Sequence, residues 1–163
     1  MTGADVPLDD PVREFWEDVI ADMEATAEEY EEEGWEALAL HPGETTPLAG
    51  EGTERPGFDV LLPDNEFEEL LSLIEVGVDF SAYEVYSTAV DDVVFLVVAM
   101  QDAATENAVL FPLYYRPGTD SAGELREHVE ATGEVRSHLR RLREDEIVTF
   151  EHEEPELFFA EAD

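Results

Sequence analysis

Residues 93–100 read VVFLVVAM, an unbroken apolar run of eight residues. A strand with apolar side chains on both faces belongs inside a sheet that is covered on each side. Two flanking segments, residues 80–90 (FSAYEVYSTAV) and 108–116 (AVLFPLYYR), are rich in aromatic and β-branched residues and also predict strands. Turns between the segments let each pair with the apolar run. Pro112 is expected at an edge or a bulge, because proline donates no ladder hydrogen bond.

Three helices are predicted around these strands. Each segment places apolar residues at helical spacing and begins near a residue suited to capping a helix. The segments are residues 10–33, capped by Asp10 and ended by Gly34; residues 65–75, capped by Asp64; and residues 125–132, preceded by a capping box from Ser121 to Glu124 and ended by Gly133.

The remaining segments are shorter or less regular. Further strands are predicted at residues 35–40, 58–62 and 147–152. The period of residues 135–142 fits either a strand or a helix. Residues 41–57 hold seven Gly or Pro in seventeen positions and predict a long surface loop. Residues 153–163 predict an acidic tail that carries three apolar side chains able to dock on the body or on a partner: Leu157, Phe158 and Phe159.

Together these segments predict one α+β domain over residues 1–152, followed by the tail. We expect a single, mainly antiparallel sheet of about five to six strands flanked by three helices. This order resembles the profilin-like group that includes the roadblock and longin domains, although the extra strand after the third helix departs from it. The resemblance implies a meander of about five strands with flanking helices, and a shared topology implies no function.

Composition excludes several functional classes. The chain has 163 residues, with 43 Asp and Glu against eight Arg, and it contains neither Lys nor Cys. Without Cys there is no disulfide scaffold, thiol enzyme or thiolate metal site. A net charge of -35 argues against binding to nucleic acids and to anionic membranes.

The same composition predicts a folded protein in water. Hydrophobic residues make up 44% of the chain, which is enough to build a core. The first residues lack the basic and apolar regions of a signal peptide, and no apolar run approaches the roughly 20 residues that span a bilayer. We therefore expect a soluble, cytoplasmic protein.

Three explanations compete for the excess acid: solvation in molar salt, mimicry of a nucleic acid, and a cation buffer or acidic tail. The acids are spread along the chain, which argues against a tail. Neither mimicry nor cation buffering forbids lysine, whereas in concentrated salt its long alkyl stem is a liability. The composition resembles that of proteins from extremely halophilic archaea, a resemblance that implies an environment and not an activity.

One segment reverses the sign of the charge. Half of the arginines lie within residues 136–143, and further basic side chains lie close by in the sequence. They could hold an anionic ligand through bidentate contacts, or they could neutralise neighbouring acids such as Glu134 and Glu146. The candidate ligand-binding residues are Arg126, Arg136, His138, Arg140, Arg141 and Arg143.

No catalytic motif is found. The serines have no nucleophile-elbow frame, the histidines lack metal-ligand spacing, and without lysine there is no Schiff base or phosphate-binding lysine. The sequence therefore predicts no catalytic residue, no metal site and no cofactor.

The favoured hypothesis is a non-catalytic protein-interaction module that binds a protein partner or forms a homodimer. The candidate surfaces are its sheet edge, the loop at 41–57 and the C-terminal aromatic residues. Central aromatics either fill the core or face a partner; they are Tyr83, Tyr86, Phe111, Tyr114 and Tyr115. One alternative is a small-ligand-binding or enzymatic domain that uses residues 136–143 for an anionic ligand. A lesser one is an acidic mimic that inhibits a nucleic-acid enzyme.

Overall fold

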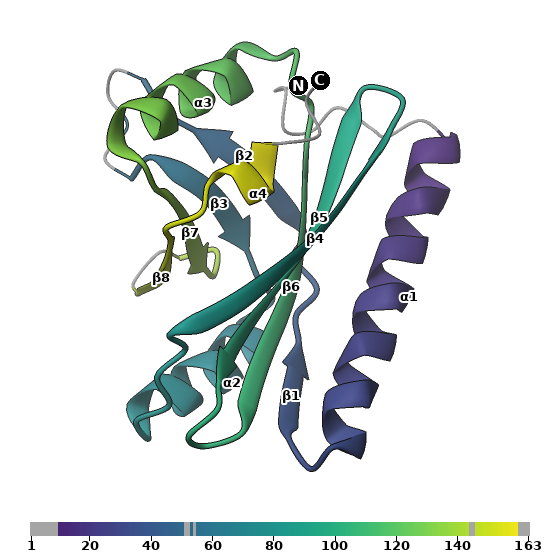
Figure 1. The fold of residues 1–163 in the computed structure, drawn as a ribbon, viewed down its shortest axis with the longest axis vertical. Helices are drawn as coiled ribbons and strands as arrows, with labels where there is room; N and C mark the ends of the chain where they lie inside the picture. The colour runs from purple at the N-terminus through teal and green to yellow at the C-terminus, as the bar shows by residue number, and fades with distance from the viewer. Residues whose placement is uncertain (1–9, 51–52, 54, 144–145, 160–163) are drawn as a thin grey trace.

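The computed structural model describes residues 10–50, 53, 55–143 and 146–159, with side chains from Arg13 onward. Within these ranges the chain forms four helices and eight strands (Figure 1). In chain order they are α1 (Asp10–Glu32), β1 (Glu36–Ala39), β2 (Glu44–Leu48), β3 (Gly57–Leu61), α2 (Asp64–Glu75), β4 (Ala82–Val90), β5 (Val93–Asp102), β6 (Asn107–Tyr115), α3 (Asp120–Thr132), β7 (Val135–Arg140), β8 (Ile147–His152) and α4 (Glu156–Phe159).

The strands form two sheets of four strands each. The first has the order β1-β6-β5-β4, and the second has the order β2-β3-β7-β8. The fold is α+β, but the expected single sheet with three helices is wrong. Sequence periodicity marks strands without naming their partners, and β3 pairs in parallel with the distant β7. The two sheets separate because each contributes one face to a shared core.

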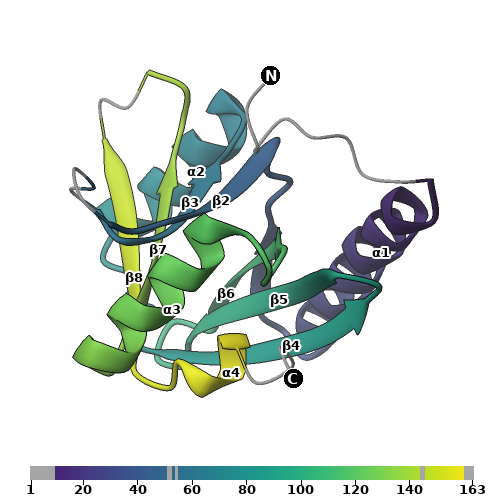
Figure 2. The ribbon, with the colours of Figure 1, turned by 90° about the horizontal axis from the view of Figure 1, so that it is seen from above.

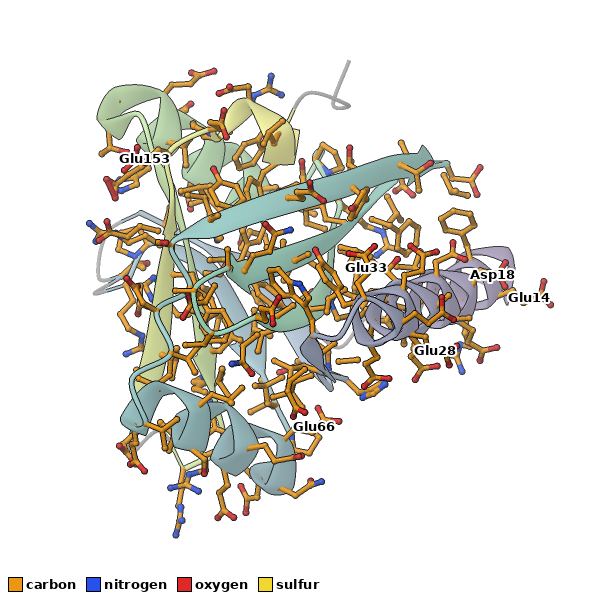
Figure 3. The ribbon with its side chains drawn as sticks, turned by 60° about the horizontal axis from the view of Figure 1, so that its bottom comes forward. Glu14, Asp18, Glu28, Glu33, Glu66 and Glu153 are labelled. Atoms are coloured by element: carbon orange, nitrogen blue, oxygen red, sulfur yellow. The ribbon has the colours of Figure 1, made fainter. Side chains whose placement is uncertain are left out.

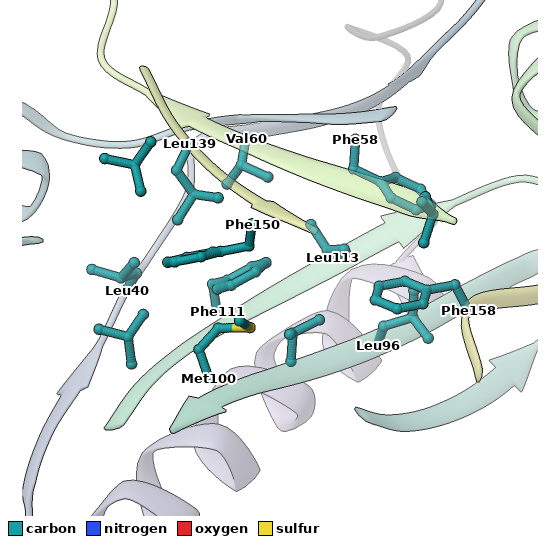
Figure 4. Packing of buried hydrophobic residues seen from close by; sticks show 14 of the residues in the cluster. Leu40, Phe58, Val60, Leu96, Met100, Phe111, Leu113, Leu139, Phe150 and Phe158 are labelled. Atoms are coloured by element: carbon teal, nitrogen blue, oxygen red, sulfur yellow. The ribbon is translucent and has the colours of Figure 1, made fainter. Parts of the chain in front are cut away.

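That core lies between the sheets and is continuous. Figure 4 shows Val60, Leu139 and Phe150 of the second sheet among Leu96, Met100, Phe111 and Leu113 of the first. A second, smaller core joins the other face of the first sheet to α1. Burial on both faces of β5 confirms the prediction from its sequence, since alternate residues enter the two cores.

Pro112 lies in the part of β6 that pairs with only one strand of its sheet, β5. The pairing of β1 with β6 ends at Leu110, so Pro112 faces no strand on that side and the expected edge position is correct locally. Beyond it, the Thr45 hydroxyl of β2 donates to the Tyr114 carbonyl at 3.0 Å and accepts from the Tyr114 N–H at 3.3 Å. This side chain joins the second sheet to the open edge of β6.

Segment 41–57 contains β2 and the start of β3, and is not simply a loop. The sequence ETTPL of β2 has no apolar alternation, so its strand geometry comes from antiparallel pairing with β3. Residues 135–142, which fitted a strand or a helix, form β7 up to Arg140.

Helix ends follow the expected signals in part. Gly34 and Gly133 adopt positive φ angles of 94° and 83° after α1 and α3, as helix-ending glycines do. The cap of α3 is the Thr119 side chain, which accepts from the Ala122 N–H, and not Ser121. Asp64 is the first residue of α2, and Pro63 occupies the cap position without a side-chain hydrogen bond.

The C-terminal segment enters the core within its described part. Phe158 and Phe159 of α4 are buried, and the Phe158 ring stacks on Phe58 with centroids 5.9 Å apart. Leu157 is 37% exposed. Residues 156–159 therefore belong to the body and not to a free tail.

None of the helices described in the chain is long and apolar enough to cross a membrane.

Candidate functional site

The arginine segment lies on β7 and just after it. Val135 and Leu139 enter the core, so the alternation of a strand turns Arg136, His138 and Arg140 to the opposite face. His138 is 4% exposed, with Nδ1 2.9 Å from the Thr149 hydroxyl and Nε2 3.0 Å from the Pro56 carbonyl. Its pKa is lowered, mainly by burial.

Most of the candidate arginines already pair with carboxylates of this chain. Arg140 makes a bidentate pair with Asp59 at 2.9 and 3.0 Å, which ties β7 to β3. Arg141 is buried, donates to Glu68 at 3.2 Å and lies 5.3 Å from the Phe67 ring centroid. The two more exposed arginines also face acids: Arg136 lies 3.1 Å from Glu134 and 3.4 Å from Glu151, and Arg126 lies 3.8 Å from Glu130.

These pairs do not assemble into an anion site. Arg143 also has an interaction partner. The hollow of about 330 Å³ beside Arg126 is lined by Glu130 and Glu156 and by none of the other five candidates. A ligand anion would have to displace carboxylates that are already in place. The geometry therefore favours neutralisation of neighbouring acids and cross-linking of strands for these arginines.

Ser137 and His152 form a buried pair that sequence reasoning missed. The Ser137 hydroxyl lies 2.9 Å from His152 Nε2, and both residues are 0% exposed. The imidazole packs between Tyr83 and Phe158, with ring centroids 4.9 and 4.8 Å away, and among the described residues its Nδ1 has no hydrogen-bond partner. Burial lowers the pKa of His152 to about 4. Both side chains lie inside the molecule, and their contact links β7 to β8.

His41 joins two helices. Its Nε2 lies 2.8 Å from Glu24 of α1, and its Nδ1 lies 2.7 Å from Glu66 of α2, whose other oxygen accepts from the His41 N–H at 2.7 Å. Burial alone would lower the pKa of His41, but hydrogen bonds to Glu66 and Glu24 raise it overall. The His41 side chain, in contact with both carboxylates, therefore links α1 and α2 near the end of β1. Across the described chain no group of three His, Asp or Glu residues is placed to hold a metal ion.

An uncharged strip lies at the open edge of the first sheet. β4 has nine residues and is the last strand in its sheet order. Residues 85–90 (VYSTAV), which we call the neutral strip, carry no charge, and four consecutive residues from Tyr86 to Ala89 are exposed. Tyr86 is 49% exposed. Its hydroxyl donates to Glu84 at 2.7 Å, and this hydrogen bond raises its pKa to about 12, with burial adding to the effect.

A groove runs beside the neutral strip. α1 packs mainly on β1, β6 and β5, and Figure 2 shows it beside the first sheet. A hollow of about 310 Å³ is lined by residues of α1, β4 and β5. Its walls are largely apolar and include Phe15, Val19 and Met23 of α1 with Phe95 and Val97 of β5. Unlike the arginine segment, this face offers main-chain groups, apolar side chains and a depression together.

The family comparison covers nearly the whole fold. A family model matches residues 8–160, from before α1 to the end of α4. The chain belongs to DUF7529, a family of unknown function. No curated protein and no solved structure matches this DUF7529 chain significantly.

The neutral strip of this DUF7529 chain has a signal in the sequence. VYSTAV is a run of six uncharged residues in a protein whose charged residues make up 31% of the total. Of the five central aromatics, Phe111 and Tyr115 are buried and Tyr83 and Tyr114 are partly buried, which leaves Tyr86 as the exposed one. Sequence reasoning named the aromatics as a set, but only the sheet order shows which of them lies on an edge.

Proposed function

We propose that the chain is a non-catalytic protein-interaction module whose binding surface is the neutral strip together with the adjoining groove. The observation that carries the proposal is the open edge of β4. An edge strand presents unpaired main-chain N–H and C=O groups that can pair with a strand of another protein.

The other sheet edges are less suited to pairing. β1 has four residues, and β2 contains Pro47, which lacks an N–H group. β8, the other edge of the second sheet, has six residues, and one of them is the charged Glu151. β4 is longer, contains no proline and carries Glu84 as its single charged residue. Proteins usually protect such an edge with charges or proline, so the lack of protection in a chain this acidic supports a binding role.

The environment that we propose is the cytoplasm of an extremely halophilic archaeon. Acids cover the molecule: Figure 3 labels Glu14, Asp18, Glu28 and Glu33 along α1, and Glu153 on the far side. Salt at about 1 M reduces the Debye length to about 3 Å and screens the repulsion among them. In that solvent, apolar association is strengthened, and a neutral strip can support binding that does not depend on charge.

The test compares two variants that add the same charge in different places. Thr88→Glu puts a carboxylate in the neutral strip, and Ala131→Glu puts one on the exposed surface of α3. Tagged proteins are used to capture binders in about 1 M KCl. We expect the unmodified chain and Ala131→Glu to retain the same bound protein, a second copy included, and Thr88→Glu to lose it. Identical capture by all three, or no bound protein, would refute the proposal.

A further inference from the structure

We propose that the partner at the neutral strip is a second copy of this chain, joined by antiparallel pairing of the two β4 strands. This inference rests on the proposed function and names the partner of the same surface. The result is a two-fold dimer in which the two first sheets form one continuous sheet of eight strands, twice the four of each copy.

Charge selects this partner. A basic protein would be attracted to almost any face of a chain with a net charge of -35, so a basic partner gives no reason for a strip without acids. A strip without acids favours a partner that is itself strongly acidic, because carboxylates that face each other across two strands repel. A second copy is such a partner, and two copies meet with least repulsion where both are neutral.

The length of β4 beyond its contact with α4 sets the register. At its start, the Tyr83 hydroxyl accepts from the Glu154 N–H at 3.0 Å, and α4 packs against the strand. Pairing is thus confined to residues 84–90, whose middle residue is Ser87. A two-fold axis perpendicular to the sheet keeps each side chain on the same face, and residues that lie opposite each other in an antiparallel pair also share a face. The axis must therefore pass between one residue and the same residue of the second copy, and not between two successive residues of the strand.

With the axis at Ser87, cross-strand neighbours are compatible. Tyr86 lies opposite Thr88 of the second copy, an aromatic and β-branched pair of a kind that stabilises sheets. Glu84 lies opposite Val90, and Val85 lies opposite Ala89. No carboxylate of residues 84–90 faces another, whereas moving the axis to Thr88 would place Glu84 opposite Asp92. In β4 the residues with even numbers lie on the face of α1, because Tyr86 lies opposite Val97, which belongs to the smaller core beside α1. Tyr86 of each copy therefore lies on the grooved face.

The absence of cysteine allows a direct test of this geometry. At the axis the two Cα atoms of position 87 are about 4.5 to 5.5 Å apart, within the range that a disulfide spans. Ser87→Cys should therefore form a covalent dimer on mild oxidation in about 1 M KCl. Ser72→Cys, at an exposed position on α2, is the matched control and should remain monomeric on a denaturing gel.

Light scattering under the same conditions gives the mass without a cross-link. We expect a dimer of the 18.3 kDa chain for the unmodified protein and for Ala131→Glu. Thr88→Glu should be a monomer, because the new carboxylate lies diagonally across from Glu84 of the second copy. Circular dichroism of each variant checks that a monomer is still folded.

The outcomes separate this inference from the proposed function. A folded monomer for the unmodified chain, with no more cross-linking at position 87 than at 72, overturns the second copy as partner. If Thr88→Glu nevertheless abolishes capture of another protein, the proposed function stands without the dimer. Dimers in all three proteins, Thr88→Glu included, place the dimer interface elsewhere and overturn this inference. If all three proteins also capture the same bound protein equally, the proposed function is overturned too.

Discussion

The buried imidazole of His152 should make the fold sensitive to acid. Its pKa falls from 6.5 to about 4, because burial disfavours the charged form. In the unfolded chain His152 takes up a proton below about pH 6.5, and in the folded chain it resists doing so. Stability is therefore lost as the pH falls from about 6.5 to about 4, and this contribution does not change further on either side of that window.

The magnitude follows from the size of the shift. A depression of about 2.5 pKa units at about 1.36 kcal/mol per unit corresponds to roughly 3 kcal/mol at the acid end of the window. The pH dependence of unfolding should therefore differ between the unmodified chain and His152→Gln, which does not titrate. Glutamine also offers a polar group to Ser137, which keeps the packing change small. Carboxylates that titrate near pH 4 are common to both proteins and cancel in the difference.

Urea unfolding in about 1 M KCl, followed by tryptophan fluorescence, measures this difference at steps between pH 7 and pH 4. We expect the unmodified chain to lose roughly 3 kcal/mol more than His152→Gln over that range. Leu157→Ala, on the half-exposed side of α4, is the control for a change nearby without a titrating group. Parallel pH profiles for the unmodified chain and His152→Gln would refute the assignment of a neutral, buried imidazole.

Three further predictions concern other contacts. The pKa of His41 is raised above 6.5, so its contacts with Glu24 and Glu66 stabilise the fold at low pH, and this stabilisation is lost as the pH rises through the raised pKa. In urea titrations His41→Gln should abolish the stability loss that the unmodified chain shows as the pH rises above about 6.5. Arg140→Ala should destabilise the fold by about 2 kcal/mol, because it leaves the partly buried Asp59 carboxylate without its bidentate partner. The exposed Arg136→Ala should cost less than about 1 kcal/mol, and equal effects of the two variants in chemical unfolding would contradict this. Dilution to about 0.1 M salt lengthens screening to about 10 Å and should expand or unfold the chain; an unchanged circular dichroism spectrum there would argue against salt adaptation.

Local pattern was a good guide to elements with one strong signal. The apolar run of β5 predicted its burial on both faces, and the spacing in α1 and α2 predicted helices close to those observed. Local pattern did not predict elements whose structure depends on contacts with other parts of the chain. β2 has no apolar alternation and becomes a strand because β3 lies beside it, and the cap of α3 moved from Ser121 to Thr119.

The candidate site shows the same division. The sequence identified the arginines, but their roles depend on carboxylates brought from other elements, such as Asp59 of β3 opposite Arg140 of β7. The link between His152 and Ser137 needs the register of β7 with β8, and the link from His41 to Glu24 needs α1 beside the end of β1. Such contacts join positions far apart in the chain, so the spacing of neighbouring residues cannot predict them.

Composition and short-range periodicity, which are properties of neighbouring residues, were enough to predict the charge, the apolar strand at 93–100 and helices at 10–33 and 65–75. Tertiary structure decided that eight strands divide into two sheets and that β4 ends one of them. It also buried Phe158 and left the four residues from Tyr86 to Ala89 exposed. The physical reason is that strand order depends on which long-range pairings close a common core, and an edge exists only relative to the strands that are paired elsewhere.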